Sequence, residues 1–492
     1  MRFTKPIGLL LAEASETGEG TLRRTLSSWN LVALGIGAII GAGLFSLTGI
    51  AAAENAGPAV ILSFVLAAVA CGFAGLCYAE FASMIPVAGS AYTYSYATMG
   101  EFMAWIIGWD LVLEYALGAA TVSVSWSRYL LELMHKYGVS LPHELVVSPF
   151  ETVTLGDGTV INGGIVNLPA IFIVLLLSLV LMRGTKESAT MNNILVILKV
   201  AVVLLFIVLG WSHINPANHT PFIPENTGSY GHFGWSGIAT GAAVVFFAFI
   251  GFDAVSTAAQ EAKNPMKGMP IGILGSLIIC TVLYVLFSYV MTGLLNYKEF
   301  AGDAKPAATA FAVTGYNFLQ DALIIAILCG YTSVILVMLM GQSRVFYTMS
   351  KDGLLPKFFS SIHAKFRTPW KTNLFFMIFV SIFAGFVPIT DLGHMVSIGT
   401  LFAFVLVCIG ILVLRKTDPN TPRPFRTPWV PFVPIMGIVV CFYLMYSLPG
   451  ESWVRLLIWM ALGVAIYFLY SKRNSVVRKK HLSGEIAVKD QH

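Results

Sequence analysis

Apolar runs of membrane length recur along almost the whole sequence, and they constrain the fold more than any other feature. A transmembrane helix needs roughly 17–25 predominantly apolar residues, and only 11% of the residues are charged. Because a bilayer offers the backbone no hydrogen-bond partners, such runs must be helical. We therefore expect an all-α integral membrane protein with twelve transmembrane helices, near residues 29–52, 58–83, 101–131, 167–183, 190–211, 235–257, 270–294, 320–345, 371–388, 394–414, 429–448 and 452–470.

Positive charges between these runs predict the orientation. If both termini lie inside, 24 of the 30 Lys and Arg residues fall in cytoplasmic segments and 5 fall outside. This bias follows the positive-inside rule, so we expect a multi-pass protein of the cell membrane with cytoplasmic N- and C-termini. The net charge of +5 then reflects loops that face anionic membrane lipids, not nucleic acid.

Residues suited to catalysis or metal binding form no cluster in the sequence. The six cysteines all fall within apolar runs and lack metal-ligand spacing, and most of the nine histidines fall between the runs. We expect small core cysteines, no metal, no cofactor and no enzymatic activity. A Gly-Asp-Gly turn within 152–161 predicts a small external hairpin.

Two of the apolar runs share an unusual glycine pattern. The runs that begin at Trp29 and Trp235 each have a glycine six residues later and reach a glycine-containing break after about twelve residues. Five helices separate the two starts, so the second copy would run in the inverted orientation. Paired, interrupted helices of this kind indicate a transporter binding site, although glycines such as Gly37 and Gly41 also permit close helix packing.

The chemistry of a broken helix favours the functional interpretation. A break at Gly41–Gly43 would leave N–H groups of Ala42, Gly43 and Leu44 at the positive end of a half-helix, which suits a carboxylate. A break at 247–251 would offer free carbonyls, which suit the three donors of an ammonium group. The two breaks together predict a site for the zwitterionic part of an amino acid.

Lys199 is an isolated charge inside the run 190–211. A lysine at this depth costs roughly 2.5–3.5 kcal/mol on insertion scales, so such residues are usually functional. We considered three roles: a substitute for a metal ion, a proton carrier, and the partner of a carboxylate.

Four stretches together resemble the amino acid–polyamine–organocation superfamily, in particular the bacterial, sodium-independent members of its cationic amino acid transporter family. They extend from the first run to the segment after the eighth, at residues 35–45, 78–94, 247–253 with 261–265, and 341–356. The resemblance implies the leucine-transporter fold, in which helices 1–5 and 6–10 are inverted repeats and helices 1 and 6 are broken. The transport core would then cover 29–414, after a cytoplasmic N-terminus at 1–28 and before peripheral helices at 415–470 and a cytoplasmic tail at 471–492.

The resemblance also implies roles for individual residues. Ile40, Gly41, Ala42, Gly43 and Leu44 match the carboxylate-binding turn of the family, and Phe247, Ala248 and Ile250 match its ammonium-binding turn. Phe247 or Phe252 would cover the substrate as an aromatic gate, with ordinary core packing as the alternative.

Lys199 matches a lysine that takes the place of the bound sodium ion of sodium-coupled relatives, with Thr332 and Ser333 as its expected neighbours. It would donate to the carbonyls around Gly37 and Ala38. Burial favours the neutral form of an amine, so we expect Lys199 to couple proton movement to transport. A permanently charged structural lysine is the alternative.

Four carboxylates within or near the apolar runs complete the set of candidates. Glu114 and Asp110 lie four residues apart on one helix face. Glu114 is a second candidate for the proton site, with a structural hydrogen bond as the alternative. Asp253 follows the second break and could contact a basic substrate side chain or lock the moving helices in place. Glu80 is expected in a charge network with Arg344 or Arg24.

These features predict a secondary active transporter that couples uptake of L-amino acids, cationic or small neutral, to protons. A proton-independent exchanger or facilitator is the alternative within the class, and an amino acid sensor or a channel is the alternative outside it. The sequence specifies neither the amino acid nor the oligomeric state.

Overall fold

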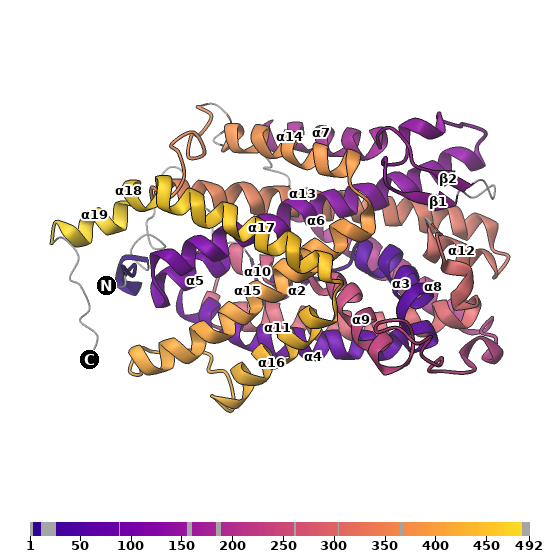
Figure 1. The fold of residues 1–492 in the computed structure, drawn as a ribbon, viewed down its shortest axis with the longest axis horizontal. Coiled ribbons are helices and arrows are strands. Elements are labelled where there is room, and N and C mark those ends of the chain that lie inside the picture. Colours follow the sequence, from indigo (N-terminus) through magenta and orange to yellow (C-terminus); the bar gives the residue numbers. More distant parts are fainter. Residues whose placement is uncertain are drawn as a thin grey trace.

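A computed structural model describes residues 3–10, 26–87, 89–154, 160–183, 188–259, 262–303, 305–364, 366 and 368–484. Helices occupy the apolar runs and make up nearly all of the regular structure (Figure 1). Segments of membrane length contain the helices α4 (Val60–Met84), α6 (Glu101–Lys136), α8 (Ser188–Trp211), α9 (Gly234–Val245), α11 (Pro265–Leu294), α13 (Asn317–Lys351), α15 (Ile389–Thr417) and α17 (Gly450–Ile466).

By length and composition, eight segments of the described chain can cross a membrane. Four more apolar helices are shorter, namely α2 (Ser28–Ile39), α7 (Leu168–Arg183), α14 (Trp370–Phe386) and α16 (Phe432–Ser447). This composition is that of a multi-pass membrane protein. The remaining short helices are α3 (Thr48–Ala51), α5 (Ser90–Thr98), α10 (Ala254–Thr257), α12 (Pro306–Ala312), α18 (Lys472–Asn474) and α19 (Val476–Leu482).

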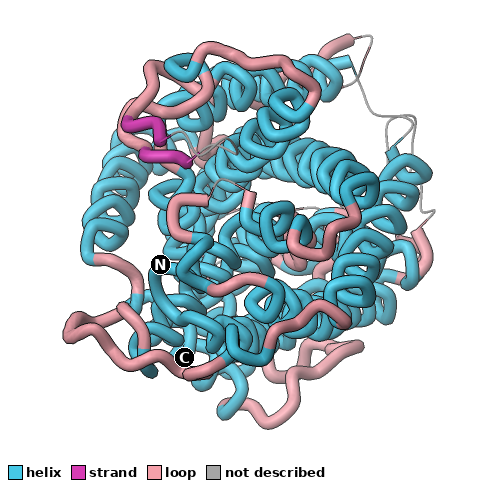
Figure 2. The backbone as a smooth tube through the Cα atoms, turned by 90° about the vertical axis from the view of Figure 1, so that its right-hand side faces the viewer, coloured by secondary structure: helices cyan, strands magenta, loops and turns pink. Residues whose placement is uncertain are grey.

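The two ends of the long axis differ in what they carry. The N-terminal segment 3–10, α18 and α19 lie at one end, and a two-stranded hairpin lies at the other (Figure 1). We call these the terminal end and the hairpin end. Figure 2 looks along this axis and shows the helices packed around one another, with the strands at the edge.

The hairpin forms where the sequence predicts it. Strand β1 (Thr152–Thr154) pairs with β2 (Val160–Asn162) in antiparallel register, with Val153 opposite Ile161. Its expected Gly-Asp-Gly turn lies outside the described residues.

Two groups of helices form the centre of the molecule. In one group, α11 packs against both α2 and α4, and α4 also packs against α9. In the other, α6 packs against α13 and α15, while α8 contacts α2, α11 and α13. The helices that carry the two glycine-containing runs therefore belong to the same group.

Glu80, at the end of α4, joins three segments through buried polar contacts. Its carboxylate accepts from Arg415 of α15 (3.0 and 2.8 Å) and from Arg423 in the following loop (3.1 Å). It also accepts from the backbone N–H of Thr427 (2.8 Å). The sequence predicted a charge network with Arg344 or Arg24. In the described chain the arginine partners of Glu80 are Arg415 and Arg423, and Arg24 lies outside the described residues.

Candidate functional site

The helix of the first apolar run is interrupted halfway. Helix α2 begins after Ser27, whose hydroxyl accepts from the N–H of Asn30 (3.3 Å). It ends at Ile39, and the backbone of the next residue, Ile40, is extended (φ −71°, ψ 108°). A wide π-helical turn, η1 (Gly43–Leu47), then restarts the helix and leads into α3.

The restart leaves fewer free donors than the sequence predicted. The N–H of Leu44 donates to Gly41 O (3.2 Å), so it is used within the new turn. The N–H groups of Ala42 and Gly43 precede that hydrogen bond and are therefore available at the N-terminus of the second half. The hydroxyl of Thr48 lies 3.1 Å from Gly43 O and 2.7 Å from Leu44 O, and it donates to one of these carbonyls at a time.

The second run is interrupted in a similar way. Helix α9 continues into the short 3-10 turn η6 (Phe246–Phe249), after which Ile250 is extended (φ −62°, ψ 135°). Gly251 follows with φ +115°, a conformation that glycine adopts readily and other residues rarely do. The helix resumes only at α10.

The two interruptions lie against each other. A Cβ atom at Gly43 would be 2.5 Å from the backbone N of Ala248, and one at Gly251 would be 2.9 Å from Ala38 O. Only glycine permits such a close backbone approach at these two positions. The two breaks thus face each other within one buried region. At the second break, Phe247 O accepts from the N–H of Ile250 (3.2 Å).

The hydroxyl of Tyr284, on α11, lies between the two interrupted helices. It is within 3.0 Å of Ile39 O and 2.8 Å of Ala248 O, and the tyrosine is fully buried. A phenol has one hydrogen, so it donates to one of these carbonyls at a time. Tyr284 therefore links the end of α2 to the turn η6.

Lys199 connects α8 to the same region. Its side chain is 1% exposed, and its Nζ atom donates to Gly37 O (2.6 Å), one of the carbonyls that the sequence singled out. Gly330 of α13 faces the aliphatic stem, since a Cβ atom there would lie 3.2 Å from Lys199 Cε. The lysine thus bridges α2, α8 and α13.

The two hydroxyl residues expected beside Lys199 bond their own helix. Thr332 donates to Leu328 O (2.8 Å) and Ser333 donates to Gly330 O (2.9 Å). Such bonds to the preceding turn are a common way to satisfy Ser and Thr within helices. Helix α13 packs against the lysine at Gly330, which has no side chain to hold the helix away.

The two candidate gate residues differ in their surroundings. Phe252 is fully buried among other rings, with ring centres 5.0 Å from Phe404 and 5.6 Å from Tyr78. Phe247, which is 4% exposed, belongs to the turn η6 itself. Phe252 thus packs within a cluster of aromatic rings, whereas Phe247 lies in the interrupted segment.

Three buried carboxylates lie on the α6 side of the breaks. Asp253 accepts from the Tyr115 hydroxyl (2.5 Å) through one oxygen, and its other oxygen has no partner in the described chain. Both oxygens of Glu114 and of Asp110 likewise lack a hydrogen-bond partner among the described residues. Unpartnered buried polar atoms indicate a place where water, a proton or a ligand is bound.

The region is closed toward the hairpin end. The hydroxyl of Tyr129, on α6, donates to Phe45 O (2.7 Å), and Tyr331, on α13, shares a hydrogen bond with Ser46 (3.0 Å). The second half of the interrupted helix is therefore tied to the neighbouring group of helices.

Several of these residues carried no distinctive sequence signal. Tyr284, Tyr129 and Tyr331 stand in apolar runs of a chain with 18 tyrosines, where a buried tyrosine is common. No group of three or more His, Cys, Asp or Glu residues within the described ranges could hold a metal ion.

The interrupted helices and the buried polar site define a multi-pass membrane protein of the transporter type. A family model described as amino acid permease matches residues 26–469. The chain belongs to this family, and the resemblance to its cationic amino acid transporter branch is confirmed.

Three relatives show the breadth of the family. The chain is 46% identical to the branched-chain amino acid permease BcaP of Bacillus subtilis, over 94% of this chain and 96% of the relative. It is 42% identical to a methylthioribose transporter of the same organism, over 96% and 98%. It is also 37% identical to cationic amino acid transporter 9 of Arabidopsis thaliana, over 87% and 74%. The family and most of these names support amino acid transport, not an enzymatic function.

Proposed function

We propose that this protein carries L-amino acids into the cell by secondary active transport, with a proton as the coupling ion. The observation that carries the proposal is the contact between the two helix breaks, at Gly43 with Ala248 and Gly251 with Ala38. Donors at one break bind the α-carboxylate, and carbonyls at the other bind the α-ammonium group. Both ends of an amino acid are thus recognised by backbone, whatever its side chain.

The proposed architecture is the leucine-transporter fold with twelve spans and two inverted repeats, within 29–414. Helices α2, α4, α9 and α11 pack together and form the moving group, while α6, α13 and α15 belong to the scaffold. The spans of 415–470 are peripheral. The protein lies in the cell membrane with both termini, 1–28 and 471–492, in the cytoplasm.

Alternating access needs a contact that can form and break between the groups. Lys199 Nζ has Gly37 O as its one hydrogen-bond partner in the described chain, although an ammonium group has three donors. A neutral amine leaves fewer donors unsatisfied in this buried position. Protonation strengthens the bond to α2 and holds the break in place; loss of the proton releases α2.

Glu114 is the second proton-coupling candidate. It is fully buried, forms no hydrogen bond among the described residues, and has the Asp253 and Asp110 carboxylates as charged neighbours. Burial and repulsion between carboxylates both favour the neutral acid. Asp253 lies close to the second break and is the candidate for contact with a basic substrate side chain. Thr332 and Ser333 help to shape the wall beside Lys199.

A second candidate substrate follows from the 42% identity with a methylthioribose transporter. Methylthioribose carries hydroxyl groups in place of an ammonium and a carboxylate group. Paired backbone donors and carbonyls suit a zwitterion better than a neutral sugar, so we favour an amino acid.

The test uses purified protein in liposomes, with and without an inward proton gradient, and radiolabelled alanine, leucine, arginine and methylthioribose. We expect the gradient to drive net uptake of at least one amino acid. In Lys199→Met, net uptake no longer responds to the gradient, while exchange of internal for external substrate persists. The matched control is Lys298→Met, which removes an exposed lysine. Full gradient-driven uptake by Lys199→Met would rule out the coupling role.

A further inference from the structure

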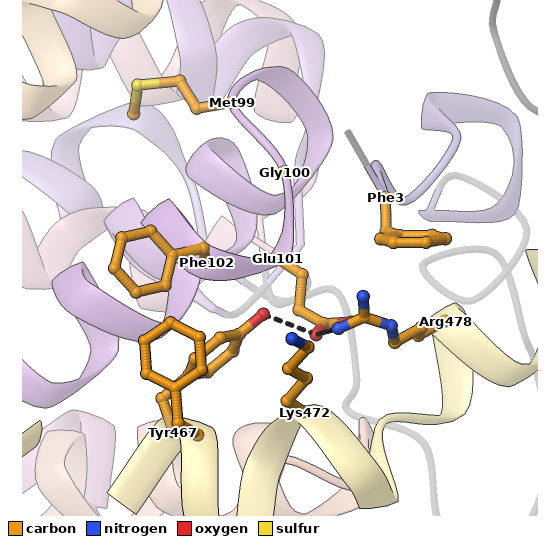
Figure 3. A pocket seen from close by; sticks show the side chains of 9 residues that line it. Phe3, Met99, Gly100, Glu101, Phe102, Tyr467, Lys472 and Arg478 are labelled. Atoms are coloured by element: carbon orange, nitrogen blue, oxygen red, sulfur yellow. Dashed lines mark hydrogen bonds and ion pairs between the residues drawn. The ribbon is translucent and has the colours of Figure 1, made fainter. Parts of the chain in front are cut away.

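A pocket of about 280 Å³ opens at the terminal end, and none of its lining residues belongs to the helix breaks. It is lined by Phe3 near the N-terminus, by Met99, Gly100, Glu101 and Phe102 at the start of α6, by Tyr467, Phe468 and Lys472 at the end of the last apolar helix, and by Arg478 of α19. Figure 3 shows that side chains from these four segments converge on it.

Glu101 is the single carboxylate among the lining residues, and donors already surround it. Tyr467 OH donates to one of its oxygens (2.9 Å), and Ser475 Oγ donates to the other (2.5 Å). Arg478 lies 3.8 Å from the same carboxylate and is also stacked over the ring of Phe3 (4.5 Å). The charge of Glu101 is therefore compensated within the pocket.

Lys472 supplies a further positive charge. Its side chain is exposed and points into the pocket beside Glu101 (Figure 3). With two cations and one carboxylate, the pocket carries a net positive charge. The surrounding segment strengthens it, because residues 472–480 contain five Lys or Arg residues and 472–484 contain no Asp or Glu.

The other side of the pocket is apolar and faces outward. Phe102 is 39% exposed and Phe468 is 51% exposed, and the neighbouring Leu469 is 72% exposed. These residues belong to helices that can cross a membrane by length and composition. Tyr467 and Phe468 both belong to a wide π-helical turn, η9 (Tyr467–Ser471), in which Tyr467 is buried and Phe468 is exposed.

From this juxtaposition we infer that the pocket binds the phosphate headgroup of an anionic glycerophospholipid, with its acyl chain along Phe102 and Phe468. A phosphate diester is a strong acceptor for the charge-assisted hydrogen bonds that Lys and Arg donate. Basic residues at the cytoplasmic end of a transmembrane helix attract anionic lipids. A free phosphate ion would use the polar half of the pocket only and leave the exposed rings uncovered.

The bound lipid would stabilise the contact between the N-terminal segment 3–10, α6 and α19. Phe3 O accepts from the N–H of Glu101 (2.9 Å), and His481 Nε2 lies 2.8 Å from Thr4 O. The lipid thus adds a contact to the place where the N-terminal segment, α6 and α19 already meet.

The experiment is a lipid titration of delipidated full-length protein in neutral detergent, followed by native mass spectrometry. The probes are phosphatidylglycerol, phosphatidylcholine and inorganic phosphate. Both lipids carry a phosphate diester, but the choline cation of phosphatidylcholine is repelled by a pocket of net positive charge. We therefore expect one phosphatidylglycerol to bind at least about tenfold more tightly than phosphatidylcholine. We expect Lys472→Gln to remove most of this preference. Inorganic phosphate at the same concentration should not displace the lipid.

The matched control is Lys479→Gln, which removes an exposed lysine from the same basic segment but not from the pocket. It should change the affinity by less than about twofold. Equal losses of affinity in the two variants would show diffuse attraction to the basic segment and overturn the proposal. Equal binding of the two lipids, or displacement of the lipid by phosphate, would also overturn it. The lipid-induced rise in Tm is measured for each protein against its own lipid-free value, so that altered folding cannot imitate the result.

Discussion

Gly43 has room for a hydrogen atom but not for a methyl group. A Cβ atom there would lie 2.5 Å from the backbone N of Ala248, and backbone cannot move aside as a flexible side chain can. We predict that Gly43→Ala pushes the two breaks apart and abolishes uptake, with a cost of about 1–3 kcal/mol in the free energy of unfolding.

Gly72→Ala is the control for this change. Gly72 lies in α4 with nothing within 4 Å of the added methyl group, and alanine favours a helix over glycine by about 1 kcal/mol. Uptake in liposomes and thermal unfolding are the two measurements. Normal uptake by Gly43→Ala would show that the close approach of the breaks is not required.

The hydroxyl of Tyr284 links the two breaks through the carbonyls of Ile39 and Ala248. Tyr284→Phe keeps the ring but leaves Ile39 O and Ala248 O without this donor. We predict a loss of about 1–3 kcal/mol in the free energy of unfolding and a lower uptake rate. Tyr289→Phe, on the same helix, is the control. Equal uptake by both variants would contradict a role for the bridge.

At the scale of helices, the Glu80 contacts fasten the end of α4 to α15 and to the loop that follows it. Glu80→Gln removes the negative charge and leaves Arg415 and Arg423 facing each other across a buried site. Breaking a buried ion pair from one side costs about 3–5 kcal/mol, so we predict a much lower unfolding temperature.

The control is Glu299→Gln, which changes an exposed carboxylate in the turn η8 (Tyr297–Phe300). An exposed charge of this kind contributes about 0–1 kcal/mol. Similar unfolding temperatures for the two variants would show that the Glu80 contacts do not hold α4 in place.

The helices themselves were the most predictable part of the structure. A membrane-length apolar run must be helical to satisfy its backbone hydrogen bonds within a bilayer. The two interruptions fall at the glycines that the sequence pattern marked. The exact turns were not predictable. The hydroxyl of Thr48 bonds a carbonyl of the π turn at Gly43–Leu47, and the N–H of Leu44, which the pattern assigned to a ligand, bonds Gly41 O instead.

Which side chains pair across different helices could mostly not be predicted from the sequence. The pattern indicated that Lys199 needs a partner and that Glu80 needs a cation, because neither charge is stable alone when buried. It could not tell that Arg415 and Arg423, hundreds of residues away, would supply that cation. The bridging role of Tyr284 depends in the same way on how α11 packs, which periodicity does not encode.

At the scale of the whole molecule, the proposed orientation places the terminal end in the cytoplasm and the hairpin end outside. We predict that a cysteine introduced at Ser140 reacts with a membrane-impermeant thiol reagent in intact cells, whereas one at Lys479 reacts only after permeabilisation. Both positions are exposed. The unmodified protein is the control, since five of its six cysteines are buried. The reverse pattern of labelling would contradict the proposed orientation, because it would place the hairpin end in the cytoplasm.

The central claim is that the two adjacent breaks recognise the α-carboxylate and the α-ammonium group of an amino acid. It is tested most directly by competition, in liposomes, against the radiolabelled amino acid with the highest uptake. We predict that its amide, its N-acetyl derivative and methylthioribose each compete at least about tenfold more weakly than the unlabelled amino acid, because each leaves buried polar groups unpaired. Equal competition by the amide or by methylthioribose would contradict the account.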